Sequence, residues 1–228
     1  RLQYISAGPL STPELSVEQA FEEIINFAKI SKNGADYAKS AINEADSDKF
    51  EDLRKKLVKY EEISDRIEYE IATFLNKVSA EEISESTSVK IKAMYKIIGE
   101  LESLGDSGET LSRILSRKNI HKKEFDSESI KNLNAMADAV NATYDVMIEN
   151  LTAARKGELV EISNAYNAED RLNTLRNNLR DSVIENIDSK GDNYQASVYF
   201  IDIINTYEQM GDFMINVSQD LERAFVRK

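Results

Sequence analysis

The sequence Leu-Glu-Ser-Leu-Gly-Asp at residues 101–106 returns as Tyr-Glu-Gln-Met-Gly-Asp at residues 207–212, which is an offset of 106 residues. Upstream, the same order recurs at an offset of 108: residues 61–67 match residues 169–175, and Asn33 matches Asn141. Three matches in the same order indicate an internal repeat. The chain is therefore predicted to hold two copies of one structural unit.

Both copies are predicted to be helical. The only two prolines are Pro9 and Pro13, and the 228 residues include just eight glycines, so little after Pro13 interrupts a helix. Capping signals divide the chain into six helices of about 30 residues. In the first half, the expected helices run from a cap at Thr12 to about Glu44, over 48–78 with Asp48 and Glu51 as the capping pair, and over 80–117 with Ser79 and Glu82 as the capping pair. In the second half, they run from a cap at Asp126 or Ser127 to about Lys156, where Gly157 ends the helix, over 158–189, where Gly191 ends it, and from a cap at Asp192 to Arg227.

The repeat and the helices together predict an all-α fold, made of two tandem three-helix bundles related by pseudo-symmetry. Residues 13–120 form the first repeat, residues 121–228 the second, and residues 1–12 a tether. Equivalent apolar stripes support this division. They are Met94, Ile97, Leu101, Leu104 and Leu115 in the third helix, and Phe200, Ile203, Tyr207, Met210 and Leu221 in the sixth.

Composition excludes several classes of function. The formal charge of −12 disfavours nucleic acid as a partner, because the chain would repel phosphate backbones. No apolar run is long enough to span a membrane, and no secretory signal opens the chain. The absence of cysteine fits a reducing compartment and would also fit a bacterial periplasm. The single histidine, His121, argues against a di-iron carboxylate enzyme, because such sites take two histidines from Glu-x-x-His motifs. No catalytic group is predicted.

The carboxylates of the repeated sequence are the candidate site. With 41 acidic residues, an acid at i and another at i+4 is expected by chance about seven times, so one pair alone carries no weight. Recurrence at the same helical phase does, and so does a glycine before the second acid in both copies, Gly105 and Gly211. A glycine inside a helix costs about 1 kcal/mol relative to alanine. Either close helix packing or a need of the site would explain it.

The segments Glu-Ser-Leu-Gly-Asp at 102–106 and Glu-Gln-Met-Gly-Asp at 208–212 resemble the repeated E/D-x-x-x-D motifs of PhoU, a family of phosphate-uptake regulators. The resemblance covers essentially the whole chain. It implies two three-helix bundles, and multinuclear iron or zinc clusters held by motif carboxylates. Carried over by position, the implied metal ligands are Glu61, Asp65, Glu102 and Asp106 in the first copy, and Glu169, Asn173, Glu208 and Asp212 in the second.

The charge of the two sets differs, because Asn173 stands where the first copy has Asp65. Converging carboxylates raise one another's pKa, and a cation would relieve the repulsion. Oxygen ligands without thiolate suit magnesium, calcium, manganese or iron. Together with the iron or zinc that the resemblance implies, this makes divalent or ferric ions (iron, zinc or magnesium) the expected cofactors, with tighter binding in the first copy. The alternative is that these side chains extend into water as ordinary helix-face charges.

The opening segment at residues 9–20 resembles the stretch that follows the last membrane helix of bacterial sodium/phosphate symporters. This resemblance implies a non-enzymatic domain on the cytoplasmic side of the inner membrane, which modulates phosphate uptake. Its partners would be the transmembrane domain of its own transporter and metal or a metal–phosphate adduct. The start at Arg1 without methionine favours an excised fragment, although a trimmed free-standing protein would look the same. A homodimer is left open.

Three other functions remain open at this point. One is a free-standing PhoU-type regulator that partners an importer and a sensor kinase, and another is a carboxylate-metal bundle enzyme. The third is a helical scaffold unrelated to phosphate, if the matches at 102–106 and 208–212 are coincidental. A basic cluster formed by Arg113, Arg117, Lys118, Lys122 and Lys123 lies next to the break between the copies. It would serve either as a contact for anionic lipid headgroups or as helix C-terminal cations in a solvated linker.

Overall fold

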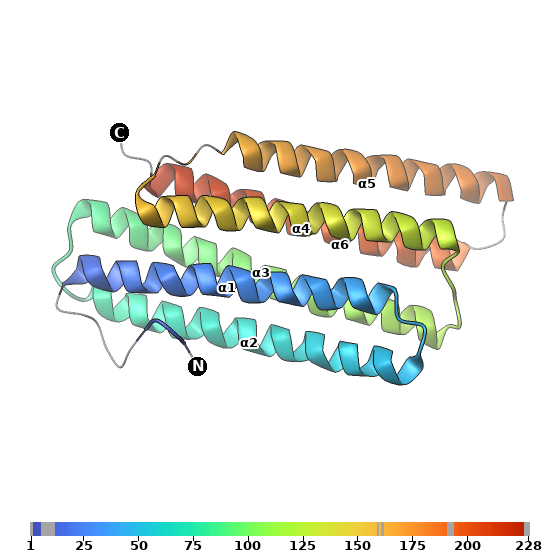
Figure 1. Ribbon diagram of the computed structural model, residues 1–228, viewed down its shortest axis with the longest axis horizontal. Helices are drawn as coiled ribbons and strands as arrows, with labels where there is room; N and C mark the ends of the chain where they lie inside the picture. Colours follow the sequence, from blue (N-terminus) through green and yellow to red (C-terminus); the bar gives the residue numbers. More distant parts are fainter. Residues whose placement is uncertain (1, 6–11, 159, 161, 191–193, 226–228) are drawn as a thin grey trace.

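The computed structural model describes residues 2–5, 12–158, 160, 162–190 and 194–225. Six long helices make up almost all of this part of the chain, and no strand occurs in it (Figure 1). They are α1 (Pro13–Ile42), α2 (Ser47–Ser79), α3 (Glu85–Ile120), α4 (Ser127–Lys156), α5 (Ser163–Lys190) and α6 (Tyr194–Phe225). The all-α prediction is confirmed.

Two helix starts and one helix end follow the signals that the sequence predicts. Thr12 caps α1 by accepting from the N–H of Leu15, and Asp126 caps α4 by accepting from that of Ser129, as expected. Gly157 ends α4 in the left-handed conformation at φ 71°, which glycine adopts without strain.

Three predicted helix starts are wrong. Asp46 caps α2, because its carboxylate accepts from the N–H groups of both Asp48 and Lys49. Ser84 rather than Ser79 caps α3, since Ser79 is the last residue of α2. The fifth helix begins at Ser163 instead of 158, after a connection in which Val160 and Ile162 are buried. The predicted Gly191 and Asp192 signals and the end at Arg227 lie outside the described residues.

The six helices form a central group of four with one helix on each outer side. Helices α1, α2 and α3 contact one another, and so do α4, α5 and α6. Across the two sets, α1 packs on α4 and α3 packs on α6, while α2 and α5 lie at opposite edges (Figure 1). This is the predicted pair of three-helix bundles, joined by the four inner helices.

One continuous apolar core runs through both bundles. Every member of the two predicted apolar stripes on α3 and α6 is buried. Within the core, the hydroxyl of Tyr144 on α4 hydrogen-bonds Oγ of Ser31 on α1 at 2.7 Å. The core therefore ties the two copies together as well as each copy to itself.

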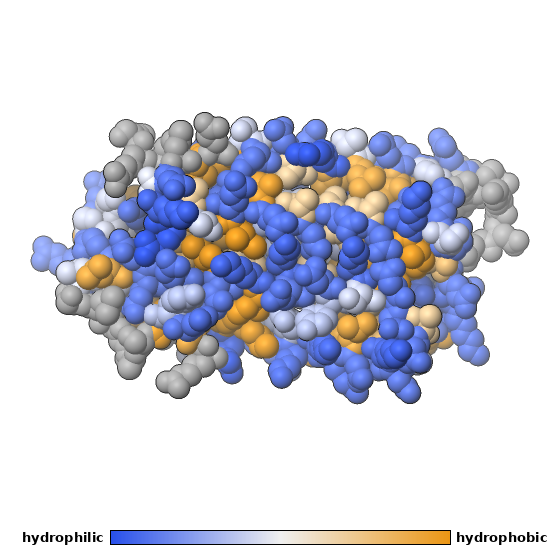
Figure 2. All heavy atoms as spheres, viewed as in Figure 1, coloured by the Kyte–Doolittle hydropathy of each residue, from blue (hydrophilic) through white to orange (hydrophobic). Residues whose placement is uncertain are grey.

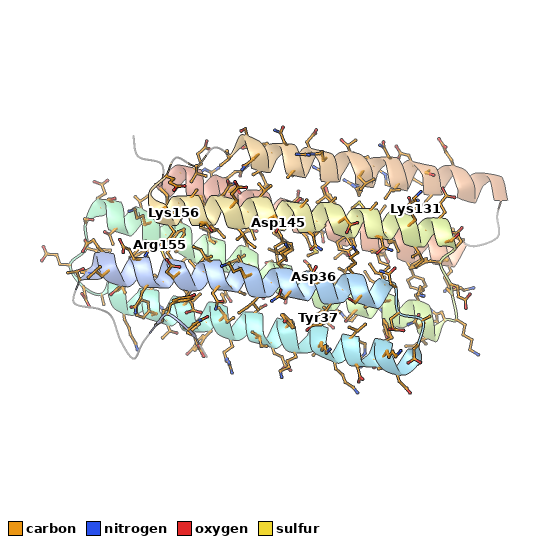
Figure 3. All side chains as sticks on the ribbon, viewed as in Figure 1. Asp36, Tyr37, Lys131, Asp145, Arg155 and Lys156 are labelled. Atoms are coloured by element: carbon orange, nitrogen blue, oxygen red, sulfur yellow. The ribbon has the colours of Figure 1, made fainter. Side chains whose placement is uncertain are left out.

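The seam between α1 and α4 carries polar pairs that run in opposite directions along the two helices. Asp36, Asp145 and Arg155 mark it in Figure 3. The pairs are Arg155 with Glu22, Lys32 with Asp145, Asp36 with Asn141, Lys39 with Asp138, and Asn43 with Asn134. Exposed pairs of this kind contribute little stability each, but in register they specify an antiparallel seam.

The outer surface is mainly polar. Hydrophilic residues cover most of the face shown in Figure 2, with apolar residues in small groups between them. None of the described helices combines the length and the apolar character that crossing a membrane requires.

Candidate metal site on the first repeat

The repeated glycines lie where two helices approach most closely. A Cβ atom at Gly105 on α3 would lie 2.5 Å from Oγ and 2.7 Å from Cβ of Ser64 on α2. A Cβ atom at Gly211 on α6 would lie 2.5 Å from Cδ2 of Leu172 on α5. Ser64 and Leu172 are themselves separated by 108 residues, so the two contacts are equivalent. Close helix packing accounts for both glycines.

This close approach brings carboxylates of α2 and α3 together. Carboxylate oxygens of Glu61, Asp65 and Asp106 all lie within 4.8 Å of one another. Glu61 is half-buried, whereas Asp65 and Asp106 are exposed. A calcium ion with oxygen ligands at about 2.3–2.6 Å could bridge such a spacing. Three of the four residues predicted for the first copy therefore form one group.

The group belongs to a longer set of carboxylates, which we call the first acidic row. It consists of Glu61, Asp65 and Glu68 on α2, and Glu102, Asp106 and Glu109 on α3. Each helix contributes acids at i, i+4 and i+7, which places them on one face. The sequence prediction missed Glu68 and Glu109, although the i+7 spacing was available to find them.

Burial and mutual repulsion make the first acidic row expensive to ionise. Burial, with smaller contributions from Asp106, Glu68 and Asp65, raises the pKa of Glu102 to about 7. The pKa of Glu61 is also raised, first by burial and then by Asp65 and Asp106. The pKa of Glu102 therefore depends on the charges of Asp65 and Asp106, although Glu102 is not one of the three clustered acids.

One cation does reach the row. Arg113, one turn after Glu109 on α3, places Nε 2.7 Å from Oε2 of Glu109. This pairing satisfies the last acid of the row, and Arg113 also lowers the pKa of Asp106 against the larger effect of burial. Five acids then remain without a described ion pair, which is an arrangement that favours a bound cation.

The second copy has the same backbone arrangement and a different charge pattern. Arg176 occupies the position equivalent to Glu68, and its Nη2 donates to Oε1 of Glu208 at 3.0 Å. Both side chains are about one-fifth exposed. Asn173 donates from Nδ2 to Oε1 of Glu169 at 2.8 Å. Arg176 also lowers the pKa of Asp212 against the larger effect of burial.

Three of the four residues predicted for the second copy are thus taken up by two internal contacts, Glu169 with Asn173 and Glu208 with Arg176. An arginine already supplies the positive charge that a metal would supply in the first copy. Within the part of the chain that the structure describes, the group of Glu61, Asp65 and Asp106 is the one set of three acids close enough to share an ion. The geometry can hold a hard cation in the first copy and an ion-pair network in the second.

His121 and the lysines of the basic cluster lie away from this row, unlike Arg113, which pairs with Glu109. His121 is the C-cap residue of α3, and its Nδ1 hydrogen-bonds the hydroxyl of Tyr199 at the start of α6. Lys118, Lys122 and Lys123 of the basic cluster line a cleft at the same end of the molecule. None of these residues contributes to the candidate metal site.

Comparison with known proteins places the fold. No family model matches the sequence, and no curated protein matches it. Among solved structures, PhoU from Pseudomonas aeruginosa matches 91% of this chain and 96% of its own, with a TM-score of 0.79 and 12% identity. The phosphate transport system regulatory protein PhoU from Streptococcus pneumoniae matches 95% of this chain and 100% of its own, with a TM-score of 0.77 and 13% identity. The chain therefore has a PhoU-like fold.

Proposed function

We propose that this chain is a non-enzymatic regulatory domain, which modulates phosphate uptake on the cytoplasmic side of the membrane as part of a sodium-dependent phosphate transporter. The observation that carries the proposal is the joint occurrence of the PhoU-like fold over nine-tenths of the chain and a PhoU-like carboxylate motif at its closest helix contact. Structural neighbours at this identity supply the fold alone. The residues of the carboxylate motif are the reason to propose a regulatory role like that of PhoU for this chain.

The partner in this proposal is the transmembrane domain of the same transporter. Residues 9–20 resemble the segment that follows the last membrane helix of sodium/phosphate symporters. A tether of about a dozen residues would hold the bundles at high effective concentration beneath the transporter. Even a weak contact would then bias the transport cycle.

The signal in this proposal is a hard cation, alone or with phosphate, held by Glu61, Asp65 and Asp106. These residues fit such a group, because they supply only oxygen atoms, at a mutual spacing that one ion can bridge. Glu102 would lie beside the bound ion and lose its proton when the ion binds. Asn173 and Arg176 make the second copy the weaker site. A ligand shifts a conformational equilibrium only through different affinities for the two states. The affinity of the first acidic row for the cation must therefore differ between the docked and the undocked domain.

Phosphate uptake tests the proposal directly. The full-length transporter in vesicles would be compared with a deletion after residue 12 and with Glu102→Gln plus Asp106→Asn, while Asp212→Asn provides the matched control. We expect both altered proteins, and not the control, to lose the dependence of uptake on internal phosphate. Unchanged uptake after the deletion would refute a regulatory role. An effect of the deletion without an effect of the double substitution would remove the acidic row from the mechanism.

A second candidate is a free-standing PhoU-type regulator. It is favoured by the coverage of the solved PhoU chains, because this chain spans 96% and 100% of their lengths. Its partners would be a separate phosphate importer and a sensor kinase. Cross-linking in cells distinguishes the two candidates, because a tail would appear on the same polypeptide as a membrane domain and a free regulator would appear at its own mass.

A further inference from the structure

A cleft of about 730 Å³ opens at the end of the molecule where α1 turns into α2 and α3 turns into α4. This end is opposite the start of α1 and the end of α6 (Figure 1). The volume lies in the range of about 300–1,000 Å³ that is typical of small-molecule sites. Its apolar wall includes Ile42, Phe50, Phe125 and Ile130, and its polar lining includes three lysines and three acids.

Lys118 is the most enclosed of these lysines. It is half-buried, and its ammonium lies 5.1 Å from the centre of the Phe125 ring. Burial lowers its pKa, and the nearby Glu124 opposes this effect only partly. No carboxylate among the described residues lies within ion-pair distance of it. A desolvated cation without an anion is destabilising until one binds.

Lys122 has an unusual backbone. It is the one described residue other than glycine with a positive φ, at 53°. Its N–H donates to the carbonyl of Asn119 at 2.9 Å, and the N–H of Lys123 donates to that of Lys118 at 3.0 Å. The end of α4 has the same pair of bonds with Gly157 at the left-handed position, where glycine is the unstrained residue. The lysine is therefore strained at a position that presents it to the cleft.

The acids that line the cleft are mostly engaged elsewhere. Oε1 of Glu44 accepts from the N–H of Asp46 at 2.9 Å. Oδ1 of Asp46 accepts from the first N–H groups of α2. Glu124 remains, and it makes no ion pair with the three lysines. The cleft therefore combines three ammonium groups with three carboxylates, two of which are held by backbone N–H groups, and an aromatic wall.

We propose that this cleft binds a soluble organic phosphate of nucleotide size, with its phosphate on Lys118, Lys122 and Lys123 and its ring system against Phe125, which is half-buried whereas Phe50 is buried in the core. Lysine ammonium groups bind phosphate as point charges, and aromatic side chains stack on bases. A free inorganic phosphate would leave the apolar wall unused. An anionic bilayer fits poorly, because the exposed acids Asp48, Asp126 and Glu128 lie at the same end and would be repelled by it.

Calorimetric titration of the 228-residue chain with AMP and ATP tests the proposal. We expect saturable ATP binding, and about a tenfold loss of affinity for Lys118→Met, which is the effect of about 1.4 kcal/mol. Lys122→Gly should weaken ATP binding by a similar factor and at the same time raise the melting temperature, because it relieves the left-handed lysine. Lys92→Met, on an exposed residue of α3 away from the cleft, is the matched control and should do neither.

Four results would overturn the proposal. The first is no saturable binding of AMP or ATP up to about 5 mM, a concentration that would reveal millimolar affinity. The second is inorganic phosphate that binds as tightly as AMP, which would show that the aromatic wall does not contribute to binding. The third is a loss for Lys92→Met equal to that for Lys118→Met. The fourth is lysine-dependent binding to phosphatidylglycerol vesicles without nucleotide binding, which would make the end a membrane contact.

Discussion

The two repeats keep the same close helix contact and differ in the charges placed around it. Ser64 against Gly105 and Leu172 against Gly211 are equivalent contacts. Along α2 the first copy has Glu61, Asp65 and Glu68, whereas along α5 the second has Glu169, Asn173 and Arg176. The acids on α3 and α6, Glu102 with Asp106 and Glu208 with Asp212, are unchanged.

This difference separates a requirement of the fold from a requirement of the site. Both copies need a residue without a side chain at the helix contact, so the glycine persists in each. Two charge changes on the outer helix, together with Ile215 in place of Glu109 on the inner one, distinguish the ion-pair network from the acidic row. The close helix contact is therefore kept in both copies, whether or not acids surround it.

The largest expected effect reverses this difference. Asn173→Asp with Arg176→Glu gives the outer helix of the second copy the charge pattern of the first. We expect a second bound Mn²⁺ per chain in equilibrium dialysis, with at least about a tenfold gain in affinity there, or about 1.4 kcal/mol of binding free energy. Asn178→Asp with Arg180→Glu makes the same charge change elsewhere on α5. An unchanged number of bound Mn²⁺ ions in the first variant, or an additional bound ion in both variants, would contradict the role assigned to Asn173 and Arg176.

A smaller effect distinguishes the two glycine contacts. At Gly105 an added Cβ meets both Oγ and Cβ of Ser64, which is a short side chain on the helix itself. We expect Gly105→Ala to lower the free energy of unfolding by about 1 kcal/mol, because the overpacking exceeds the gain from the better helix propensity of alanine. At Gly211 the close atom is the end of Leu172, whose Cγ is 3.7 Å away, so this leucine can rotate and Gly211→Ala should cost less.

Urea denaturation measures both glycine substitutions. Gly99→Ala is the matched control on α3, because its Cβ would come no nearer than 4.0 Å to a side-chain atom. Alanine is the better helix former by about 1 kcal/mol, so this variant should be neutral or more stable. Equal losses at Gly99 and Gly105 would show that the contact with Ser64 is not the cause.

The smallest expected effect is a pH dependence specific to the first copy. The folded pKa of Glu102 is about 7, above its ordinary value near 4.5, so the folded state binds the extra proton between these values. Stability without metal should therefore rise as the pH falls from about 7.5 to 5.5. Glu102→Gln should flatten the melting temperature across this window. A slope equal to that of the unsubstituted protein would show that Glu102 does not titrate there.

The sequence predicted the helices better than their ends. Thr12 and Asp126 cap as expected because each directly precedes an uninterrupted helix. The Ser79 prediction is wrong because α2 still includes Ser79, and the true cap lies five residues further on, at Ser84. Ser79 is followed by Glu82 three residues later and Ser84 directly by Glu85, and local spacing does not show which serine still belongs to the preceding helix.

The sequence predicted where the candidate site lies, but it did not identify all of the residues that form it. The repeat located Glu61, Asp65, Glu102 and Asp106 on two helices that do meet. It did not reveal that Glu102 lies beside the three clustered acids, because a repeat gives the helix face and not the rotation of one helix against another. Arg176 was missed although the 108-residue offset pairs it with Glu68. A count of charges along both helices would have found it.

Cation binding to matched single variants tests the proposed difference between the copies most directly. Mn²⁺ would be titrated into the unsubstituted chain, Asp106→Asn and Asp212→Asn, with the melting temperature read in parallel, because a ligand present at 100 times its Kd adds about 2.7 kcal/mol of stability. We expect Asp106→Asn to abolish both the binding and the thermal shift, and Asp212→Asn to leave them nearly intact. Equal losses from the two substitutions, or no Mn²⁺ bound by the unsubstituted chain, would contradict a cation site in the first repeat.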